Sequence, residues 1–336
     1  GTKEDYELLE KFEKNFARYN QSKYCVGVAS GTDAITLSLI ANNIGNGDEV
    51  ITPNLTAYPT AVGILNSGAT PIPIDIYSNN GLIKVDEVEK LLTKKTKAIV
   101  PVHLYGHPCN MDTLKKVCYE NNLILIEDCA QALGAEYRGQ KVGSFGHCSA
   151  FSFYPTKNIG AYGDGGAIIT NDEKVYDQLV SLRNYGNIGG YLHQKRGLNS
   201  RLDEIQAAIL NVKLKYIDEW SERRANNASY YNEHFNEFSD IVTPHNLAEC
   251  RHVYNQYVIR VKDRDSVRQL LTERGIGCAV YYPYPIHTQP CVSNLGYAQG
   301  DFPVTEKVCK EVLALPIYPD LKQEELLYIT KELTSL

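Results

Sequence analysis

Hydrophobic positions along the chain follow two alternating periods. Tyr6, Leu9, Phe12 and Phe16 recur at helical spacing, which predicts an amphipathic helix over residues 3–19. The segments that follow alternate between short apolar runs and helical stretches. Strands are expected at residues 24–29, 48–52, 98–104, 123–127 and 167–170, and helices at 31–43, 56–66 and 111–121.

This alternation over roughly the first two thirds of the chain predicts an α/β layered fold with a mostly parallel sheet. Residues 123–127 (LILIE) are apolar, rich in β-formers and bounded by turn signals, as expected of a strand buried on both faces. The layered fold in turn predicts that polar residues directly after such strands lie at one edge of the sheet.

The pattern changes after a long helical stretch at residues 201–231. A strand is expected at 253–261, followed by a helix at 266–274, a Pro- and Tyr-rich loop at 281–285, and helices at 302–315 and 322–335. These elements predict a smaller α+β unit. We therefore expect two tightly packed domains, 1–220 and 221–336, in agreement with a chain of 336 residues at about 150 residues per domain.

Charge and composition exclude several classes of protein. The net charge is -6, which argues against a nucleic-acid-binding protein, because phosphate contacts need clustered Lys and Arg. No apolar run is long enough to span a bilayer, and no signal peptide is recognisable. The chain begins at Gly1 rather than Met, so we expect the natural N-terminus to lie further upstream.

The pattern of the nine cysteines indicates the cellular compartment in which the protein works. Their number is odd, their spacing is irregular and no C-x-x-C pair occurs, so neither a disulfide framework nor a zinc site is expected. We expect no metal at all, and a reduced, cytoplasmic location.

Lys157 has the first context that suggests chemistry. An aromatic strand (FSFY) precedes it, and the Gly-rich segment 160–166 follows it. Most lysines are solvated surface amines, but glycines let the backbone approach a ligand closely. A lysine desolvated in such a place has a lowered pKa and becomes a nucleophilic amine that forms Schiff bases.

Asp128 directly follows the buried strand 123–127. It could simply cap a helix. It could equally lie at the carboxyl end of a parallel strand, where α/β sheets bind ligands, and hold a protonated pyridine nitrogen as pyridoxal 5'-phosphate (PLP) requires. From the residues alone the two interpretations have equal weight.

Residues 30–34 (SGTDA) precede a helix and form a loose capping box. Gly31 and Thr32 also offer free backbone N–H groups at the helix N-terminus, which suits a phosphate. Alone this signal is weak, but together with Lys157 and Asp128 it forms a set that rarely arises by chance.

The set resembles the DegT/DnrJ/StrS family of PLP-dependent nucleotide-sugar aminotransferases over nearly the whole chain. The matching segments are ASGTDA, IEDCAQALGA, SFYPTKNIGAYGDGG, LNSRLDEIQAAIL, HVYNQYVIR, PYPIHTQP and LPIYP. The resemblance implies the aspartate-aminotransferase fold (fold type I), with a large domain built on a seven-stranded sheet. It also implies a homodimer with active sites at the interface.

The resemblance implies roles for individual residues. Lys157 would form the Schiff base with PLP and move the proton, Asp128 would bind the pyridinium nitrogen, and Gln131 would lie near the ring hydroxyl. Tyr58 matches the aromatic residue that stacks on the cofactor ring. The cofactor phosphate and the sugar nucleotide would be bound by the remaining matches: Gly31, Thr32 and Ser152 at the phosphate, Asn199 at the phosphate of the neighbouring subunit, and His287 and Tyr282 at the sugar nucleotide. For His287 and Tyr282, a Pro-stiffened surface loop is nearly as good an interpretation.

The implied function is an aminotransferase that takes the amino group of L-glutamate. The P-T-K and G-D-G-G motifs are similar to those of family members that aminate C3, which favours a dTDP-linked 3-keto-6-deoxyhexose and deoxyamino sugar biosynthesis for a lipopolysaccharide or other glycan. A UDP-linked 3-keto uronic acid is the rival substrate.

Two further alternatives come from other classes. A sugar dehydratase of the same fold would replace Lys157 by His, and a non-catalytic regulator would be expected to lose Lys157, Asp128 or Gln131. All three residues are present.

Overall fold

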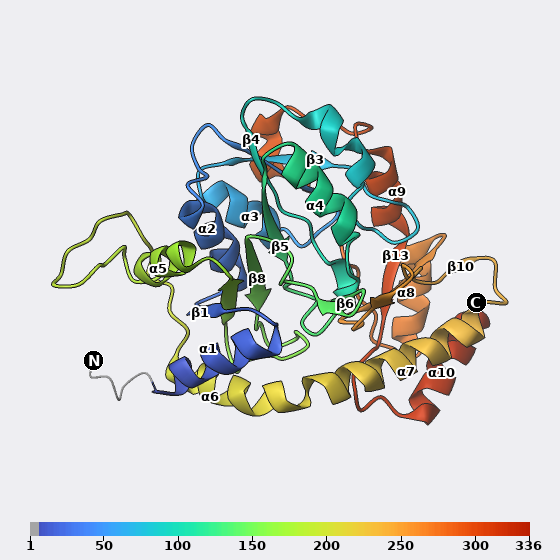
Figure 1. The fold of residues 1–336 in the computed structure, drawn as a ribbon. Coiled ribbons are helices and arrows are strands. Elements are labelled where there is room, and N and C mark those ends of the chain that lie inside the picture. The colour runs from blue at the N-terminus through green and yellow to red at the C-terminus, as the bar shows by residue number, and fades with distance from the viewer. Residues whose placement is uncertain (1–6) are drawn as a thin grey trace.

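A seven-stranded sheet forms the centre of the computed structural model, which describes residues 7–336 (Figure 1). Its strands are β1 (Tyr24–Val28), β2 (Glu49–Pro53), β3 (Thr70–Ile74), β4 (Thr96–Ile99), β5 (Ile124–Asp128), β8 (Cys148–Ser152) and β9 (Gly166–Thr170), in the order β1-β9-β8-β5-β4-β2-β3. Only β9 runs antiparallel to its neighbours among these strands. The predicted α/β fold with a mostly parallel sheet is therefore confirmed.

Helices cover both faces of this sheet. One face packs against α1 (Glu7–Tyr19), α4 (Met111–Glu120) and α6 (Glu204–Lys213), and the other against α2 (Gly31–Ala41), α3 (Pro59–Asn66) and α5 (Glu173–Leu182). Leu9, Phe12 and Phe16 of α1 are buried at the helical spacing that predicted this element. Residues 3–6 of that predicted helix lie outside the described residues.

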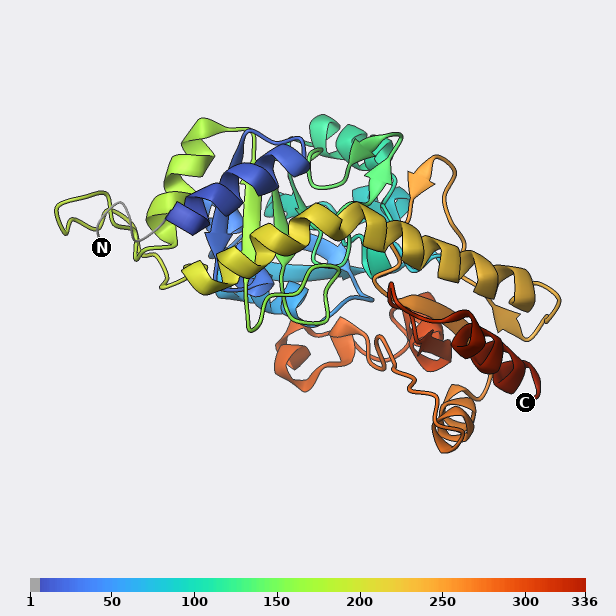
Figure 2. The ribbon, with the colours of Figure 1, turned by 90° about the horizontal axis from the view of Figure 1, so that it is seen from below.

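The C-terminal part forms a second core around a small antiparallel sheet. Its elements are α7 (Ile217–Phe235), β10 (Ile241–Val242), β12 (Tyr257–Val261), α8 (Arg264–Glu273), α9 (Pro303–Glu311), β13 (Val312–Leu315) and α10 (Gln323–Thr334). Figures 1 and 2 show α6 and α7 nearly in line, linking the large sheet to this second unit. The expected domain boundary at residue 220 falls inside α7, and we propose it as the division between the two cores.

The remaining elements are short. They are β6 (Glu136–Tyr137), β7 (Gln140–Lys141), β11 (Cys250–Arg251) and the 3₁₀ helices η2 (Val85–Leu91), η3 (Leu104–Gly106), η4 (Leu214–Tyr216), η5 (Ile286–Thr288) and η6 (Pro290–Leu295). Strand β11 pairs with β6, which attaches the chain after α7 to the large unit. The loops around η3 and η5 also approach the end of the large sheet, as described below.

Some predicted elements differ from the structure. The helix expected over 302–315 is wrong in its last four residues, because Val312–Leu315 form β13 and pair with β12. The long helix expected over 201–231 is interrupted at η4. Strand β3 and helix α5 were not predicted. Within residues 7–336, no helix has the length and apolar character needed to cross a membrane.

Candidate active site

A cavity of about 340 Å³ lies at the carboxyl ends of β5 and β8 and the N-terminus of α2. This edge of an α/β sheet is the usual place for a ligand. Six residues predicted for the site line the cavity: Gly31, Thr32, Asp128, Gln131, Ser152 and Lys157. These residues come from segments far apart in the sequence, and the fold brings them together.

Lys157 is the one cationic side chain among the described residues that line this cavity. Burial lowers the pKa of its amine from the ordinary 10.5, and the negative charge of Asp128 partly opposes that shift. An amine with a lowered pKa has a larger neutral fraction near neutral pH and is therefore a better nucleophile and base.

Asp128 ends β5 and is almost fully buried. One carboxylate oxygen accepts a hydrogen bond from the Ala130 N–H at 3.0 Å, and the other accepts one from the Thr60 hydroxyl at 2.8 Å. Burial raises the pKa of Asp128 above its ordinary 3.8, while these two bonds and Lys157 pull it down. The result is a fixed, desolvated carboxylate facing the cavity, which suits a cationic partner.

The N-terminus of α2 provides a place for an anion. Ser30 caps the helix by accepting the Asp33 N–H, and the first N–H groups of the helix, at Gly31 and Thr32, have no partner within it. A Cβ on Gly31 would lie 2.7 Å from the Cβ of Ser152, so only glycine permits this approach. Backbone N–H groups and the hydroxyls of Thr32 and Ser152 thus surround one end of the cavity.

Gln131 has both ends of its amide bound. Its Oε1 accepts the Tyr105 N–H at 2.6 Å, and its Nε2 donates to the Tyr282 hydroxyl at 2.8 Å. Tyr282 therefore lies next to a cavity residue, although it does not line the cavity itself.

Tyr58 and His287 occupy other positions. Tyr58 lies between two lining residues, Ala57 and Pro59, and its hydroxyl is 2.7 Å from the sulfur of Cys291. His287 is buried away from the cavity: its Nδ1 accepts a hydrogen bond from Asn54 at 2.8 Å, and its Nε2 is 3.2 Å from Glu306. In this chain His287 therefore links its loop to the segment after β2.

Asn199 is exposed and does not line the cavity of its own chain. The next residue, Ser200, is buried, donates to the Asp33 carboxylate at 2.6 Å and accepts the Ala29 N–H at 3.1 Å. The backbone at Asn199 is thus fixed beside the N-terminus of α2, with its amide directed to solvent.

A buried network fixes the end of β5 below Asp128. The Glu127 carboxylate accepts N–H groups from Gly143, Phe145 and Gly146 at 2.7–2.9 Å. It also meets Nε2 of His103 at 3.0 Å, and because His103 Nδ1 accepts a backbone N–H, Nε2 is the protonated nitrogen. Because these bonds occupy the carboxylate oxygens of Glu127, we assign Glu127 and His103 a structural role rather than metal binding.

Two residues at the site were missed in the sequence. Thr60 holds Asp128, and Tyr105 holds Gln131. The Thr-x-x-x-Thr spacing of residues 56–60 was a weak available signal, because it brings the two hydroxyls within 2.9 Å of each other at the start of α3.

Comparison with known proteins identifies transaminases among its relatives. The chain is 44% identical over 318 residues to dTDP-3-amino-3,6-dideoxy-alpha-D-galactopyranose transaminase of Aneurinibacillus thermoaerophilus, covering 94% of this chain and 86% of the relative. It is 42% identical over 301 residues to the UDP-N-acetyl-3-dehydro-alpha-D-glucosamine 3-aminotransferase of Acidithiobacillus ferrooxidans, covering 90% and 81%. It is also 43% identical over 331 residues to a pleiotropic regulatory protein of Geobacillus stearothermophilus, covering 98% and 89%.

Solved structures agree with this relationship. DesV of S. venezuelae in complex with a ketimine intermediate has a TM-score of 0.95 at 39% identity, covering 98% of this chain and 88% of DesV. NtdA of Bacillus subtilis with the bound cofactor PMP has a TM-score of 0.91 at 32% identity, covering 98% and 76%. A model of the DegT/DnrJ/EryC1/StrS aminotransferase family matches residues 1–334. The chain therefore belongs to this family and is a transaminase whose cofactor is PLP.

Proposed function

We propose that the protein transfers the amino group of L-glutamate to the C3 ketone of a dTDP-linked 3-keto-6-deoxyhexose. Nucleotide-linked sugars are the substrate class of its transaminase relatives. The observation that carries the proposal is the cavity that Lys157 and Asp128 line together with the N-terminus of α2, whose free N–H groups suit a phosphate.

The cavity residues fit PLP. Asp128 would hold the pyridine nitrogen as a cation, Gly31, Thr32 and Ser152 would hold the phosphate, and Lys157 would attach the cofactor covalently. When bound, PLP supplies an electron sink for the reacting carbon. Lys157 then removes and returns the proton at the α-carbon of the amino donor.

Two neighbouring residues complete this proposal. Gln131 would face the ring hydroxyl of the cofactor from its fixed position. Tyr58 would lie against the ring, since the residues on either side of it line the cavity. Tyr282 would contribute near the sugar through its contact with Gln131, and we no longer place His287 there, because Asn54 and Glu306 enclose its imidazole.

A panel of substrates tests the proposal. Purified enzyme with L-glutamate is mixed with dTDP- and UDP-linked keto sugars, and amino-sugar product is followed by mass spectrometry. We expect amination of a dTDP-linked 3-keto-6-deoxyhexose, with Lys157→Ala as the inactive control. Amination of UDP-linked 3-keto uronic acids instead would establish the rival. The UDP-sugar aminotransferase relative supports UDP as the nucleotide, but its name does not specify a uronic acid.

A non-catalytic regulator is the second candidate, because one relative bears a regulatory name. A regulator has no need for the lysine, carboxylate and amide that this chain places around one cavity. If the PLP-loaded protein fails to accept an amino group from L-glutamate, the regulator becomes the better assignment.

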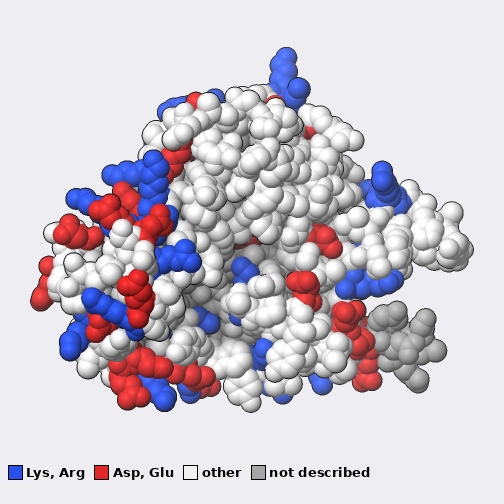
Figure 3. Space-filling view, turned by 180° about the vertical axis from the view of Figure 1, so that it is seen from behind, with Lys and Arg blue, Asp and Glu red and all other residues white. Residues whose placement is uncertain are grey.

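We also propose that the enzyme is a homodimer. Two long segments, 50–74 and 279–300, lack Lys, Arg, Asp and Glu and pack against each other, with Ile286 N–H donating to the Asn54 carbonyl. Figure 3 shows a broad face that carries few charged side chains. Charge depletion is typical of the buried core of an interface, and a second copy of this chain is the proposed occupant.

The dimer would also complete the cofactor site. The phosphate of PLP carries negative charge, whereas the described residues at the cradle offer only neutral donors. Asn199, exposed in its own chain, would supply a further donor to the partner's phosphate. A bond to a charged group contributes about 1.5–3 kcal/mol, so Asn199→Ala should weaken PLP binding by roughly 10- to 150-fold.

A mixed dimer decides whether Asn199 acts across the interface. Asn199→Ala and Lys157→Ala chains carry different tags, and the mixed dimer is purified and verified by mass. Each homodimer should be nearly inactive at limiting PLP. If Asn199 serves the partner, one site of the mixed dimer is intact, and about half of the wild-type activity should return. Absence of recovery would show that Asn199 acts within its own chain, beside the nearby α2.

We propose the cytoplasm as the compartment of this enzyme. All nine cysteines are free thiols in the structure, as expected where the environment is reducing.

A further inference from the structure

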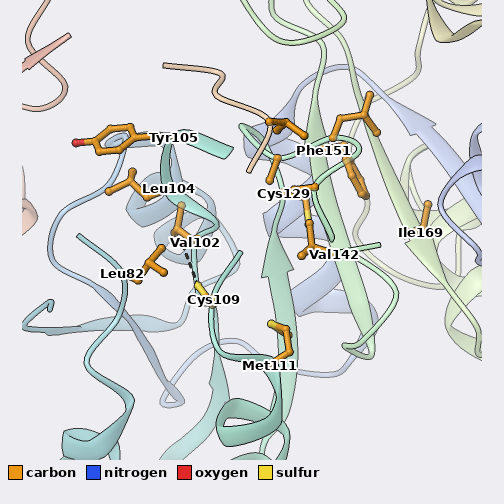
Figure 4. Close-up of a cluster of buried hydrophobic side chains, with 14 of the residues drawn as sticks. Leu82, Val102, Leu104, Tyr105, Cys109, Met111, Cys129, Val142, Phe151 and Ile169 are labelled. Carbon is orange, nitrogen blue, oxygen red and sulfur yellow. Dashed lines mark hydrogen bonds between the residues drawn. The ribbon is translucent and has the colours of Figure 1, made fainter. Parts of the chain in front are cut away.

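Tyr105 has a backbone conformation that a bulky residue rarely adopts. It lies in η3, just after β4, with φ 60° and ψ 6°. A left-handed conformation is unfavourable for any residue with a Cβ, and its persistence in an aromatic residue indicates that surrounding contacts impose it. Figure 4 shows Tyr105 at the edge of the large apolar cluster, with its hydroxyl oxygen pointing away from Cys129 and Phe151.

The first imposed contact determines how the Gln131 amide is oriented. The Tyr105 N–H can only donate, so its partner at 2.6 Å must be the carbonyl oxygen Oε1 of Gln131. The opposite end, Nε2, is then fixed as the donor end. One of its two hydrogens goes to the Tyr282 hydroxyl at 2.8 Å, and the other remains for the cavity that Gln131 lines.

The second contact attaches the same tyrosine to the loop that carries Tyr282. The Tyr105 hydroxyl donates to the backbone carbonyl of Tyr281. Tyr105, Tyr281, Tyr282 and Gln131 thereby close a ring of hydrogen bonds between the large unit and the 281–285 loop. A closed ring leaves each member fewer alternative positions than a single contact would.

We propose that Tyr105 is a positioning residue of the aminotransferase reaction. Its backbone turns the donor end of Gln131 toward the cofactor, and its hydroxyl holds Tyr282 against the same amide. The inference rests on the proposed role of Gln131 at the ring hydroxyl of PLP. It assigns a purpose to the VHLYGH segment, whose role at the site the sequence alone did not indicate.

Tyr105→Phe, Tyr282→Phe and the double variant test the ring. The apoproteins are titrated with PLP, and the visible absorbance of the loaded proteins is followed against pH. Loss of one hydrogen bond should raise the Kd for PLP by about 2- to 12-fold in each single variant. Both changes open the same ring, so the Kd for PLP of the double variant should be no higher than that of the single variant with the higher Kd. All three variants should also show the same shift in the pH midpoint of their absorbance change.

Tyr257→Phe is the matched control. Its hydroxyl is bound to Asn232 at 2.7 Å in the second core, so this variant should lower the melting temperature and leave PLP binding unchanged. If Tyr105→Phe behaves like this control, or if the effects of Tyr105→Phe and Tyr282→Phe simply add, Tyr105 is not a positioning residue.

Gln131→Glu keeps the test decisive if Tyr105→Phe does not fold. A carboxylate still accepts the Tyr105 N–H but offers no donor to the cavity, so its Kd for PLP should rise more than that of Tyr282→Phe. An unchanged Kd would overturn the inference. Wild-type protein is measured in parallel: failure of the wild type to bind PLP would refute the proposed function, whereas wild-type binding with unaffected variants would refute only the role of Tyr105.

Discussion

Replacement of Lys157 by alanine is expected to abolish transamination while the protein remains folded and binds PLP without a covalent link. No other lysine or arginine among the described residues lines the cavity, so no other amine can take over. Proton transfer by a positioned side chain contributes about 10²- to 10⁴-fold to a rate, so the half-reaction with L-glutamate should slow by at least this factor. Stopped-flow absorbance measures it directly.

The covalent link is tested separately from the rate. Borohydride reduction of the wild-type protein should fix PLP on the peptide that contains Lys157, and mass spectrometry should detect no such adduct in Lys157→Ala. Lys157→Arg is the matched control, because it keeps a positive charge toward Asp128 while its guanidinium stays protonated. Turnover near the wild-type rate in Lys157→Ala, or an adduct on another lysine, would contradict the assignment.

The pH dependence of cofactor capture follows from the same amine. Only neutral Lys157 can attack the PLP carbonyl, so capture should accelerate as pH rises toward its pKa and then level off. Burial lowers the pKa of Lys157 below 10.5, so the plateau should begin at a lower pH than it does for an exposed lysine.

Hydrophobic periodicity predicted the layered fold because most strands of the large sheet are buried on both faces. Strand β3 escaped prediction for a specific reason: its sequence, TPIPI, contains Pro71 and Pro73. Proline cannot donate to a ladder, but β3 lies at the edge of the sheet, where only one side of the strand is paired. Such a position depends on strand order, which the local pattern does not contain.

The error at residues 302–315 has a different cause. Val312–Leu315 (VLAL) is a short apolar run, and a run of this length suits a buried strand as well as the end of a helix. Pairing with β12 decides in favour of the strand. Likewise, the helix expected from residue 56 begins at Pro59, since proline favours the first turn, and Tyr58 precedes the helix between two residues that line the cavity.

The site was predictable only where a motif carried it. Lys157, Asp128 and Gly31 lie in segments whose local sequence already suggests chemistry, and the fold places them around one cavity. Thr60 and Tyr105 act through contacts with residues 68 and 26 positions away. Apart from the weak Thr-x-x-x-Thr signal at residues 56–60, nothing in their local sequences marks these two residues, so the three-dimensional arrangement identifies them.

Replacement of Asp128 by asparagine is the second change with a large expected effect. Asparagine keeps the shape of the side chain: its one carbonyl oxygen can still accept the Ala130 N–H, and its NH2 group can donate to the Thr60 hydroxyl oxygen. It removes the negative charge that would hold the pyridine nitrogen protonated, and with it the electron sink. Loss of one partner of a buried ion pair costs about 3–5 kcal/mol, which predicts a rate of the half-reaction with L-glutamate lower by about 150- to 5000-fold.

Affinity for PLP should fall far less than the rate, because the phosphate cradle at α2 and Lys157 remain intact. Equilibrium titration and stopped-flow kinetics on the same preparation separate the two effects. If Asp128→Asn carries out the half-reaction at the wild-type rate, Asp128 only caps the following turn and has no catalytic role.

Thr60→Val provides the matched variant. It leaves the carboxylate in place and removes the hydroxyl bond that lowers the pKa of Asp128, together with the contact between the Thr60 and Thr56 hydroxyls. The charged carboxylate is the active form, so activity should be lost as pH falls through the pKa of Asp128. Burial already raises that pKa above 3.8, and loss of the Thr60 bond should raise it further. The acidic limb of the rate profile should therefore move to higher pH in Thr60→Val, with the rate on the plateau nearly unchanged. A profile that keeps its acidic midpoint would show that Asp128 does not set it.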